Sequence, residues 1–189
     1  LYVIFTRSGV NIRGYPAILA HLERYRRPTI DAAGKKVKGL EPRGGRDYRK
    51  PGSYEWYEIQ DNIAYYKEFA QPKVVFSKFI DGPRFAFDSS GAFVNNANAI
   101  IADVEPWLTA ILQSRLLWFM LRMRITRLQN GYFQVMNENL GPLPILPPGE
   151  LRTKLNGAVS SLLASGLTFE GGQQLERSVD EAVYTIYDL

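Results

Sequence analysis

The sequence predicts a mixed α+β domain, with short and mostly antiparallel strands around a buried central helix and a helical hairpin at the C-terminal end. Three observations support this fold class. Short runs of β-branched and aromatic residues alternate with turns rich in Gly, Asn, Asp and Ser. A long apolar stretch at residues 103–124 has the spacing of a buried helix. Two later stretches repeat Leu and Val at helical intervals.

The first third of the chain predicts a strand, a helix and a loop. Residues 1–5 alternate weakly and are typical of a strand. Residues 15–25 place Ile18, Leu19 and Leu22 on one face of an amphipathic helix, which Pro28 should end. Residues 29–53 are rich in Gly, Pro, Lys and Arg, so we expect a long surface loop of the kind that often carries function.

Short elements follow in the middle of the chain. Residues 62–69 predict a short helix, and residues 73–80 predict a strand. Residues 84–87 and 92–95 predict a hairpin around the turn of residues 88–91, which ends in Gly. Residues 99–102 predict another short strand.

The stretch at residues 103–124 predicts the central helix. Asp103 is a good N-cap, and Pro106 is tolerated in a first helical turn. Substituting Leu112 or Phe119 by Ala should therefore cost about 2–5 kcal/mol as a core cavity. The broad apolar face expected to be buried consists of Trp107, Leu108, Ile111, Leu112, Leu116 and Phe119.

The last part of the chain predicts a strand at residues 132–135 and a proline-stiffened extended segment at residues 141–148. Two helices should follow, around residues 151–162 and 175–186, joined near Ser165-Gly166 and Gly171-Gly172. This hairpin is acidic and differs in character from the preceding sequence. We therefore expect one domain over residues 1–147 and the C-terminal helical hairpin over residues 148–189.

Composition excludes several classes of function. The chain has no cysteine, which excludes disulfides and thiolate metal sites and favours a cytoplasmic protein. Its one histidine, His21, is expected on a helix surface. A serine–histidine triad would have to use this residue, so such a triad is not expected. Glycine-rich phosphate and dinucleotide motifs are absent from the sequence. Lys73, Lys78 and Asp81 have too generic a spacing for a nuclease metal site, and no catalytic, metal or cofactor residue is predicted.

No segment of the sequence predicts a secretory signal or a membrane span. The most apolar run, residues 116–121, is far shorter than the roughly 20 residues that a spanning helix needs. The chain opens on Leu1 within a strand-like run, so we expect a fragment of a larger protein.

The net charge of +4 is unevenly distributed. Residues 24–50 hold ten Lys and Arg against three acidic residues, and residues 115–127 hold four Arg and no acid. Such clusters indicate a polyanionic partner, although basic clusters also occur as solvated loops and helix ends. An ordinary helix C-terminus would explain Arg122 and Arg124 through the helix dipole, but it says less about Gln129 and Asn130.

Sequence readout of DNA needs these residue types. Arg and Lys contact phosphates and guanine, and Asn and Gln read adenine. Two sets lie on predicted loops or element ends, where a scaffold could project them into a groove. The predicted DNA-binding residues are Arg43, Arg46, Tyr48, Arg49 and Lys50 in the first set, and Arg122, Arg124, Arg127, Gln129 and Asn130 in the second.

A series of short motifs runs along most of the chain. The motifs are residues 15–18 (YPAI), 54–60 (YEWYEIQ), 71–76 (QPKVVF), 84–88 (RFAFD), 112–116 (LQSRL), 116–133, 143–145 (LPI) and 179–187. In this order they resemble the C-terminal target-recognition (specificity) domain of TaqI-like and Eco57I-like adenine-specific DNA methyltransferases from type II, including type IIG, restriction-modification systems. The departure from the family pattern is mild, since Gln113-Ser114-Arg115 stands where Asn-Ser-Lys is common.

The resemblance implies a DNA sequence-recognition domain that does no chemistry itself. A catalytic domain of the same parent chain would bind S-adenosylmethionine and methylate adenine N6 in double-stranded DNA, and the parent enzyme could also carry an endonuclease. The methylation motif is absent from this sequence, and the family shares no fixed base-reading positions. The alternative is a protein-interaction or assembly module of such a system, without direct DNA contact, which the acidic hairpin favours.

Overall fold

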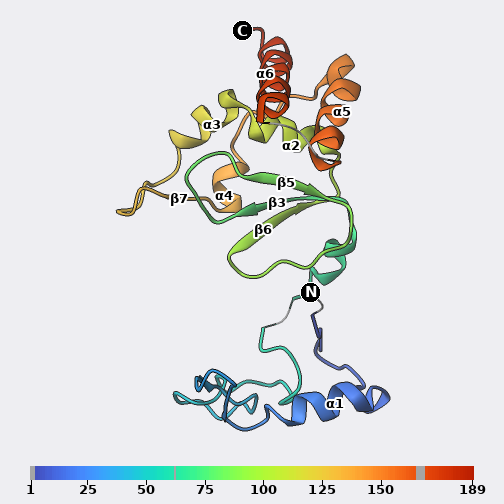
Figure 1. Cartoon of the computed structure of the whole chain (residues 1–189), viewed down its shortest axis with the longest axis vertical. Helices are drawn as coiled ribbons and strands as arrows, with labels where there is room; N and C mark the ends of the chain where they lie inside the picture. The colour runs from blue at the N-terminus through green and yellow to red at the C-terminus, as the bar shows by residue number, and fades with distance from the viewer. Residues whose placement is uncertain (1–2, 62, 165–168) are drawn as a thin grey trace. The chain divides into compact units, whose positions relative to one another are not determined.

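The computed structural model describes residues 3–61, 63–164 and 169–189. The chain divides into two compact units, Leu1–Tyr65 and Tyr66–Leu189 (Figure 1). Residues 147 and 148, where the sequence predicts a boundary, both lie inside the second unit. The C-terminal helices belong to that unit because Leu155, Val159 and Val183 share one apolar core with strand residues such as Val74 and Phe76.

The first unit contains little regular structure. Its elements are η1 (Ile12–Gly14), α1 (Pro16–Glu23), β1 (Thr29–Ile30) and β2 (Lys36–Val37). The predicted helix is confirmed as α1, which begins with Pro16 in its first turn and has no fully buried residue. The antiparallel pair β1–β2 lies inside the segment predicted to be a loop. Residues 3–5 of the predicted first strand have no strand structure, and residues 1–2 lie outside the described residues.

The second unit is built on a three-stranded antiparallel sheet with the order β5-β3-β6. The strands are β3 (Lys73–Ser77), β5 (Phe85–Asp88) and β6 (Asn98–Ala102), so the strand predicted at residues 99–102 is confirmed. The hairpin predicted over residues 84–95 is wrong, because β5 pairs with β3 and residues 92–95 form no strand. The Asp88 carboxylate accepts the N–H groups of Ser90 and Ala92, which turns the chain away after β5.

Two of the shorter predictions are partly correct. The strand predicted over residues 73–80 divides into β3 and β4 (Phe79–Ile80), and β4 pairs with β7 (Phe133–Gln134), which confirms the strand predicted near residues 132–135. The helix predicted at residues 62–69 is found as the 3-10 helix η2 (Tyr66–Ala70), while Asn62 lies outside the described residues.

The predicted central helix is two helices, α2 (Pro106–Gln113) and α3 (Arg115–Arg122), broken at Ser114. Ser114 has an extended backbone, and its hydroxyl donates to Ile111 O at 2.7 Å and accepts from Leu117 N at 3.3 Å. The hydroxyl thus serves the end of one helix and the start of the next. The predicted N-cap at Asp103 is also wrong, because Glu105 precedes Pro106 at the start of α2 and Asp103 has a φ of 57°.

The break changes which side of the apolar stretch is buried. Leu117 and Leu121, four residues apart on α3, are each 1% exposed, whereas Phe119 on the opposite side is 64% exposed. The prediction that Phe119 is a core residue is therefore wrong, while Ile111 and Leu112 on α2 are buried as predicted.

Leu121→Ala should cost about 2–5 kcal/mol because it leaves a cavity. Phe119→Ala should change the free energy of unfolding by no more than about 0.5 kcal/mol, as an exposed substitution does. Urea unfolding followed by far-UV circular dichroism, which reports mainly on the helices of the second unit, measures both values. Equal losses in the two variants would contradict the observed register of α3.

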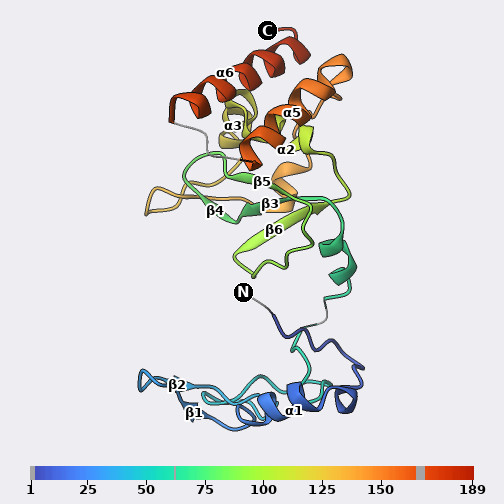
Figure 2. The ribbon, with the colours of Figure 1, turned by 45° about the vertical axis from the view of Figure 1, so that its right-hand side comes forward.

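The C-terminal helices are α5 (Arg152–Leu163) and α6 (Phe169–Ile186), which confirms both predicted helices. They follow α4 (Asn137–Leu140) and η3 (Gly149–Leu151). Ser165-Gly166, part of the predicted connection, lies outside the described residues. The other part, Gly171-Gly172, was predicted wrongly, because these residues lie inside α6. Within this unit α2 lies between the sheet and the α5–α6 pair (Figure 2), so the core runs through three layers.

Candidate nucleic-acid interface

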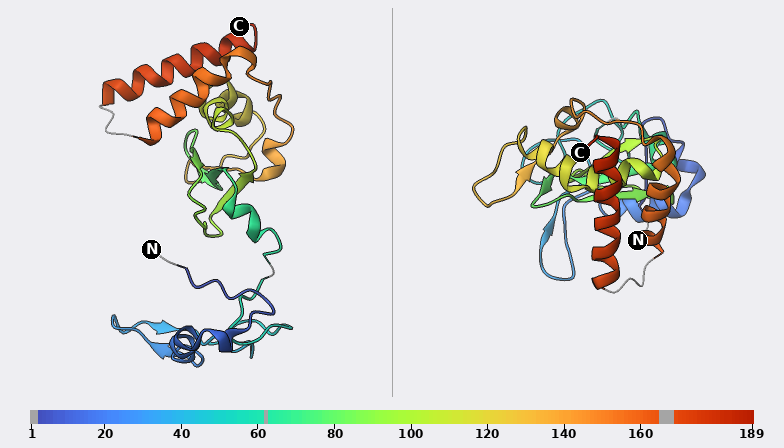
Figure 3. Two further views of the ribbon diagram at one scale, coloured as in Figure 1. Left: turned by 90° about the vertical axis from the view of Figure 1, so that its right-hand side faces the viewer. Right: turned by 90° about the horizontal axis from the view of Figure 1, so that it is seen from above.

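A projecting hairpin after α3 carries the second predicted set of DNA-binding residues. We call residues 122–134 the basic hairpin (Figure 3). Its arms are joined by Leu128 N to Tyr132 O at 2.7 Å and by Gln134 N to Thr126 O at 3.3 Å. Gly131 donates to Leu128 O at 3.0 Å and has a φ of 86°, the left-handed conformation that closes a three-residue hairpin loop. Gln129 and Asn130 therefore stand at the tip.

The side chains of the basic hairpin are well placed to meet a polyanion. Arg122, Arg124, Arg127, Gln129 and Asn130 are all exposed. No acidic residue occurs between Glu105 and Glu138, so the sequence near the hairpin offers these arginines no local counter-charge.

Two members of this set also have structural contacts. The Arg122 guanidinium lies 5.6 Å from the Phe133 ring centroid and 6.0 Å from that of Trp118, which fixes the base of the hairpin against α3. Asn130 Oδ1 accepts from Tyr132 N at 3.2 Å and so supports the turn. Arg124, Arg127 and Gln129 are therefore the members best suited to reach a ligand.

The first predicted set lies on a loop of the first unit, residues 39–50. A bridge between Gly39 and Tyr48 and a hydrogen bond from Gly44 N to Arg49 O at 2.8 Å close this loop. Gly44 and Gly45 both have φ near +77°, a conformation that disfavours other residues. This part of the predicted surface loop is therefore closed by its own backbone contacts.

Arg49 holds this loop together from inside. Its guanidinium donates to the carbonyl oxygens of Leu40, Trp56 and Glu58, each at 2.6 Å, and lies 4.8 Å from the centroid of the Tyr54 ring. Burial lowers the pKa of the Arg49 guanidinium. All three nitrogens are committed to backbone carbonyls, so Arg49 has a structural role that sequence reasoning missed.

The other residues of the first set differ in their contacts and in their exposure to solvent. Arg43 pairs with the buried Glu41 carboxylate at 2.6 Å and lies 5.6 Å from the centroid of the half-buried Tyr48 ring. Arg46 and Lys50 are exposed. The structure brings each predicted set together within its own unit, on one loop and on one hairpin.

Two residues considered for catalysis, His21 and Lys73, have contacts that suit a structural role. His21 is exposed on α1, as predicted, with its ring 5.3 Å from Tyr25. Lys73 is fully buried and pairs with Asp88, while its ammonium donates to Phe69 O at 2.7 Å. Among the described residues no group of three or more His, Asp and Glu could hold a metal ion.

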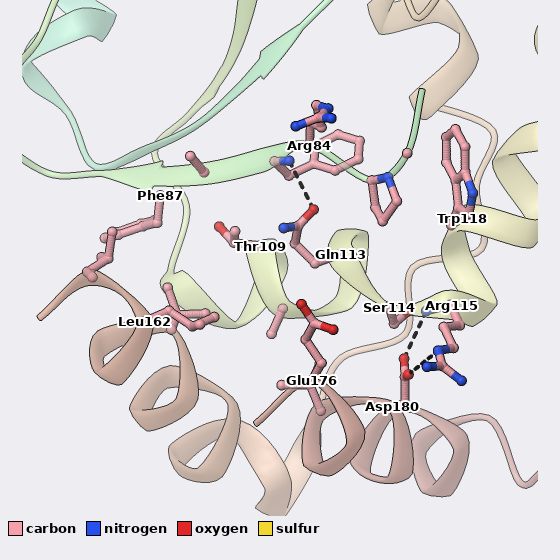
Figure 4. A pocket seen from close by; sticks show the side chains of 18 residues that line it. Arg84, Phe87, Thr109, Gln113, Ser114, Arg115, Trp118, Leu162, Glu176 and Asp180 are labelled. Carbon is pink, nitrogen blue, oxygen red and sulfur yellow. Dashed lines mark hydrogen bonds and ion pairs between the residues drawn. The ribbon is translucent and has the colours of Figure 1, made fainter. Parts of the chain in front are cut away.

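Sequence reasoning missed a cleft of about 680 Å³ in the second unit. It lies between β5, α2 and the α5–α6 pair (Figure 4). Thr109 and Gln113, four residues apart on α2, form a polar row in an otherwise apolar helix, which is the signal that could have drawn attention to it.

A scan against protein-family models finds no match to this chain, and no curated protein sequence matches it. In the part of the chain that the structure describes, no helix has the length and apolar character needed to cross a membrane.

Proposed function

We propose that this chain is a DNA sequence-recognition domain of a restriction-modification adenine-N6 methyltransferase. Its α+β core would be of the DNA-methylase-specificity type. It would bind double-stranded DNA and position it for a catalytic domain outside this chain, and that domain would bind S-adenosylmethionine. The chain itself supplies recognition and no catalytic group.

The observation that carries the proposal is the basic hairpin. A two-stranded ribbon fits the major groove of B-DNA, where amide side chains read adenine and arginine reads guanine. The hairpin places Gln129 and Asn130 at its tip and Arg124 and Arg127 on its arms, all exposed. Amides at the tip and cations behind them match base contacts flanked by phosphate contacts.

The loop at residues 39–50 offers a second set of phosphate contacts. Its exposed cations are Arg43, Arg46 and Lys50. Arg43 is paired with Glu41, whereas Arg46 and Lys50 take no part in the hydrogen bonds that close the loop. We assign them to phosphate binding, which is independent of base sequence, and assign base reading to the hairpin tip.

A mixed-sequence duplex of about three helical turns tests the proposal. Fluorescence anisotropy of the labelled duplex with the full chain should show binding that weakens steeply from about 50 to 200 mM salt. With at least three phosphates neutralised, the slope of log K against log salt should be about −2.7 or steeper. Undetectable binding at the low-salt end, or a slope near zero, would favour the interaction-module alternative.

A further inference from the structure

The cleft beside β5 is lined by groups that match the backbone of an extended peptide. We propose that it binds such a segment from a partner protein, as an added strand on the open edge of β5. This inference does not rest on the proposed DNA binding, because the cleft and the basic hairpin are made of different residues.

The first support is the direction of the β5 backbone. β5 is an edge strand, paired with β3 on one side. Phe85 N donates to Gln113 Oε1 at 3.0 Å, so the Phe85 amide points away from β3. Backbone groups alternate in direction along an antiparallel strand, so the N–H and C=O of Phe87 also point away from β3. No strand pairs with β5 on that side within the described residues.

The second support is a buried hydroxyl that lines the cleft. Thr109 is 5% exposed, and its Oγ1 has no hydrogen-bond partner among the described residues. Figure 4 shows Thr109 and Gln113 on the side of α2 that faces β5. A buried hydroxyl without a partner costs free energy, and a peptide amide in the cleft would remove that cost.

The third support is the composition of the opposite wall. Leu162 and Leu163 of α5 are large apolar side chains that are 40% and 55% exposed, and both line the cleft. Glu176 of α6 lies on the same wall and is exposed, while Asp180 is already held by Arg115. An added strand would place alternate side chains against these leucines, with a basic residue near Glu176.

These features together favour a peptide over a compact small molecule. An edge strand offers donors and acceptors at the repeat of a β-strand, and a segment in the extended conformation matches that repeat over several residues. The expected occupant is therefore an extended segment with apolar side chains at alternate positions and one Lys or Arg.

A displayed library of random nonapeptides, selected against the full chain, tests the inference. The selected peptides should bind saturably at one site and share apolar residues at alternate positions. Each is then made in two forms, N-methylated at the odd or at the even amides. One form should lose at least about tenfold in affinity and the other should keep it, because alternate amides face β5. Selection of no binding peptide, or equal binding of the two forms, overturns the inference.

Two variants test whether the peptide binds in this cleft. Thr109→Val keeps the side-chain shape, removes the unpartnered hydroxyl and should weaken peptide binding about fivefold without lowering stability. Leu162→Lys should weaken it further by placing a charge on the apolar wall. Lys154→Gln, an exposed change on the same helix outside the cleft lining, is the matched control. Unchanged peptide binding in both cleft variants overturns the inference, while DNA binding by the same variants reports separately on the proposed function.

Discussion

Replacing Arg124 and Arg127 by Gln is expected to weaken duplex DNA binding about a hundredfold at low salt. Each arginine is exposed on the basic hairpin and would make a charge-assisted contact to a phosphate. Such a contact is worth about 1.5 kcal/mol or more, which corresponds to about tenfold in affinity. The double variant should also flatten the slope of log K against log salt by about 1.8, since each phosphate contact contributes about 0.9.

The matched control is the double variant Lys154→Gln and Arg177→Gln. It removes the same charge from the exposed faces of α5 and α6. If contact with the hairpin drives binding, the control should keep nearly all of the affinity and the slope. Equal losses in the two double variants would show that net charge alone drives the binding, and no loss in the hairpin variant would contradict the assignment of this surface.

A third variant separates base reading from phosphate binding. Gln129→Ala at the hairpin tip leaves every arginine in place, so it should leave the salt slope unchanged while relaxing the preference for one base pair. Asn130 is less suited to this test because its Oδ1 also supports the turn through Tyr132 N.

The elements that the sequence predicts well are those with a local cause. The repeat of Leu155 and Val159, or of Val179 and Val183, appears in the sequence itself, and both helices form with these residues buried. The partner of β5 has no such local cause. Asp88, Ser89, Ser90 and Gly91 are typical of a hairpin turn to the next residues, but β5 pairs with the preceding strand β3, which the turn residues do not reveal.

The helical spacing of apolar residues does not reveal the break at Ser114. Apolar residues continue on both sides of it, so the stretch reads as one helix whose face would bury Phe119. The structure shows that Asp180 of α6 accepts from Arg115 N at 2.8 Å at the start of α3. That hydrogen bond joins residues 65 positions apart and helps to stabilise a new helix start, which the local pattern cannot predict.

In the candidate site, too, the sequence predicts local features and misses those that arise on folding. The sequence correctly predicts that Arg46 and Arg49 lie on one loop. It does not show that Arg46 is exposed while Arg49 binds backbone carbonyls inside the loop. Arg49 is internal because three carbonyl oxygens from Leu40, Trp56 and Glu58 converge on it, and that convergence exists in the folded loop alone. The cleft beside β5 was missed for a related reason. Thr109 is buried because α2 packs against other elements, and that packing exists only in the folded unit.

The second large effect is expected in the second unit, at the ion pair between Lys73 and Asp88. These residues lie opposite each other on β3 and β5, and the Lys73 side chain is completely buried. Asp88→Ala would leave a buried ammonium with Phe69 O as its remaining hydrogen-bond partner among the described residues. Removing one partner of a buried pair costs about 3–5 kcal/mol, so this variant should lose much of its stability.

Lys73→Met should cost less than Asp88→Ala. The Asp88 side chain is 21% exposed and keeps hydrogen bonds from Ser90 and Ala92, so its carboxylate remains solvated when the ammonium is gone. The double variant should be more stable than Asp88→Ala alone, because it removes the uncompensated charge. A urea denaturation series measures all three, and a small loss in Asp88→Ala would show that the pair is not a buried ion pair.

The pH dependence of stability gives an independent reading of the same pair. Burial raises the pKa of Asp88, but hydrogen bonds from Lys73 and Ser90 outweigh it and hold the pKa below its ordinary value. A carboxyl group with a depressed folded-state pKa stabilises the fold above its unfolded pKa of about 3.9, and that contribution is lost as the pH falls through the folded value. The Lys73→Met variant, which lacks the main hydrogen-bond donor to Asp88, should therefore lose less stability than the wild type between about pH 5 and pH 2. Parallel losses in the two proteins would contradict the role of Lys73 in holding the Asp88 pKa down.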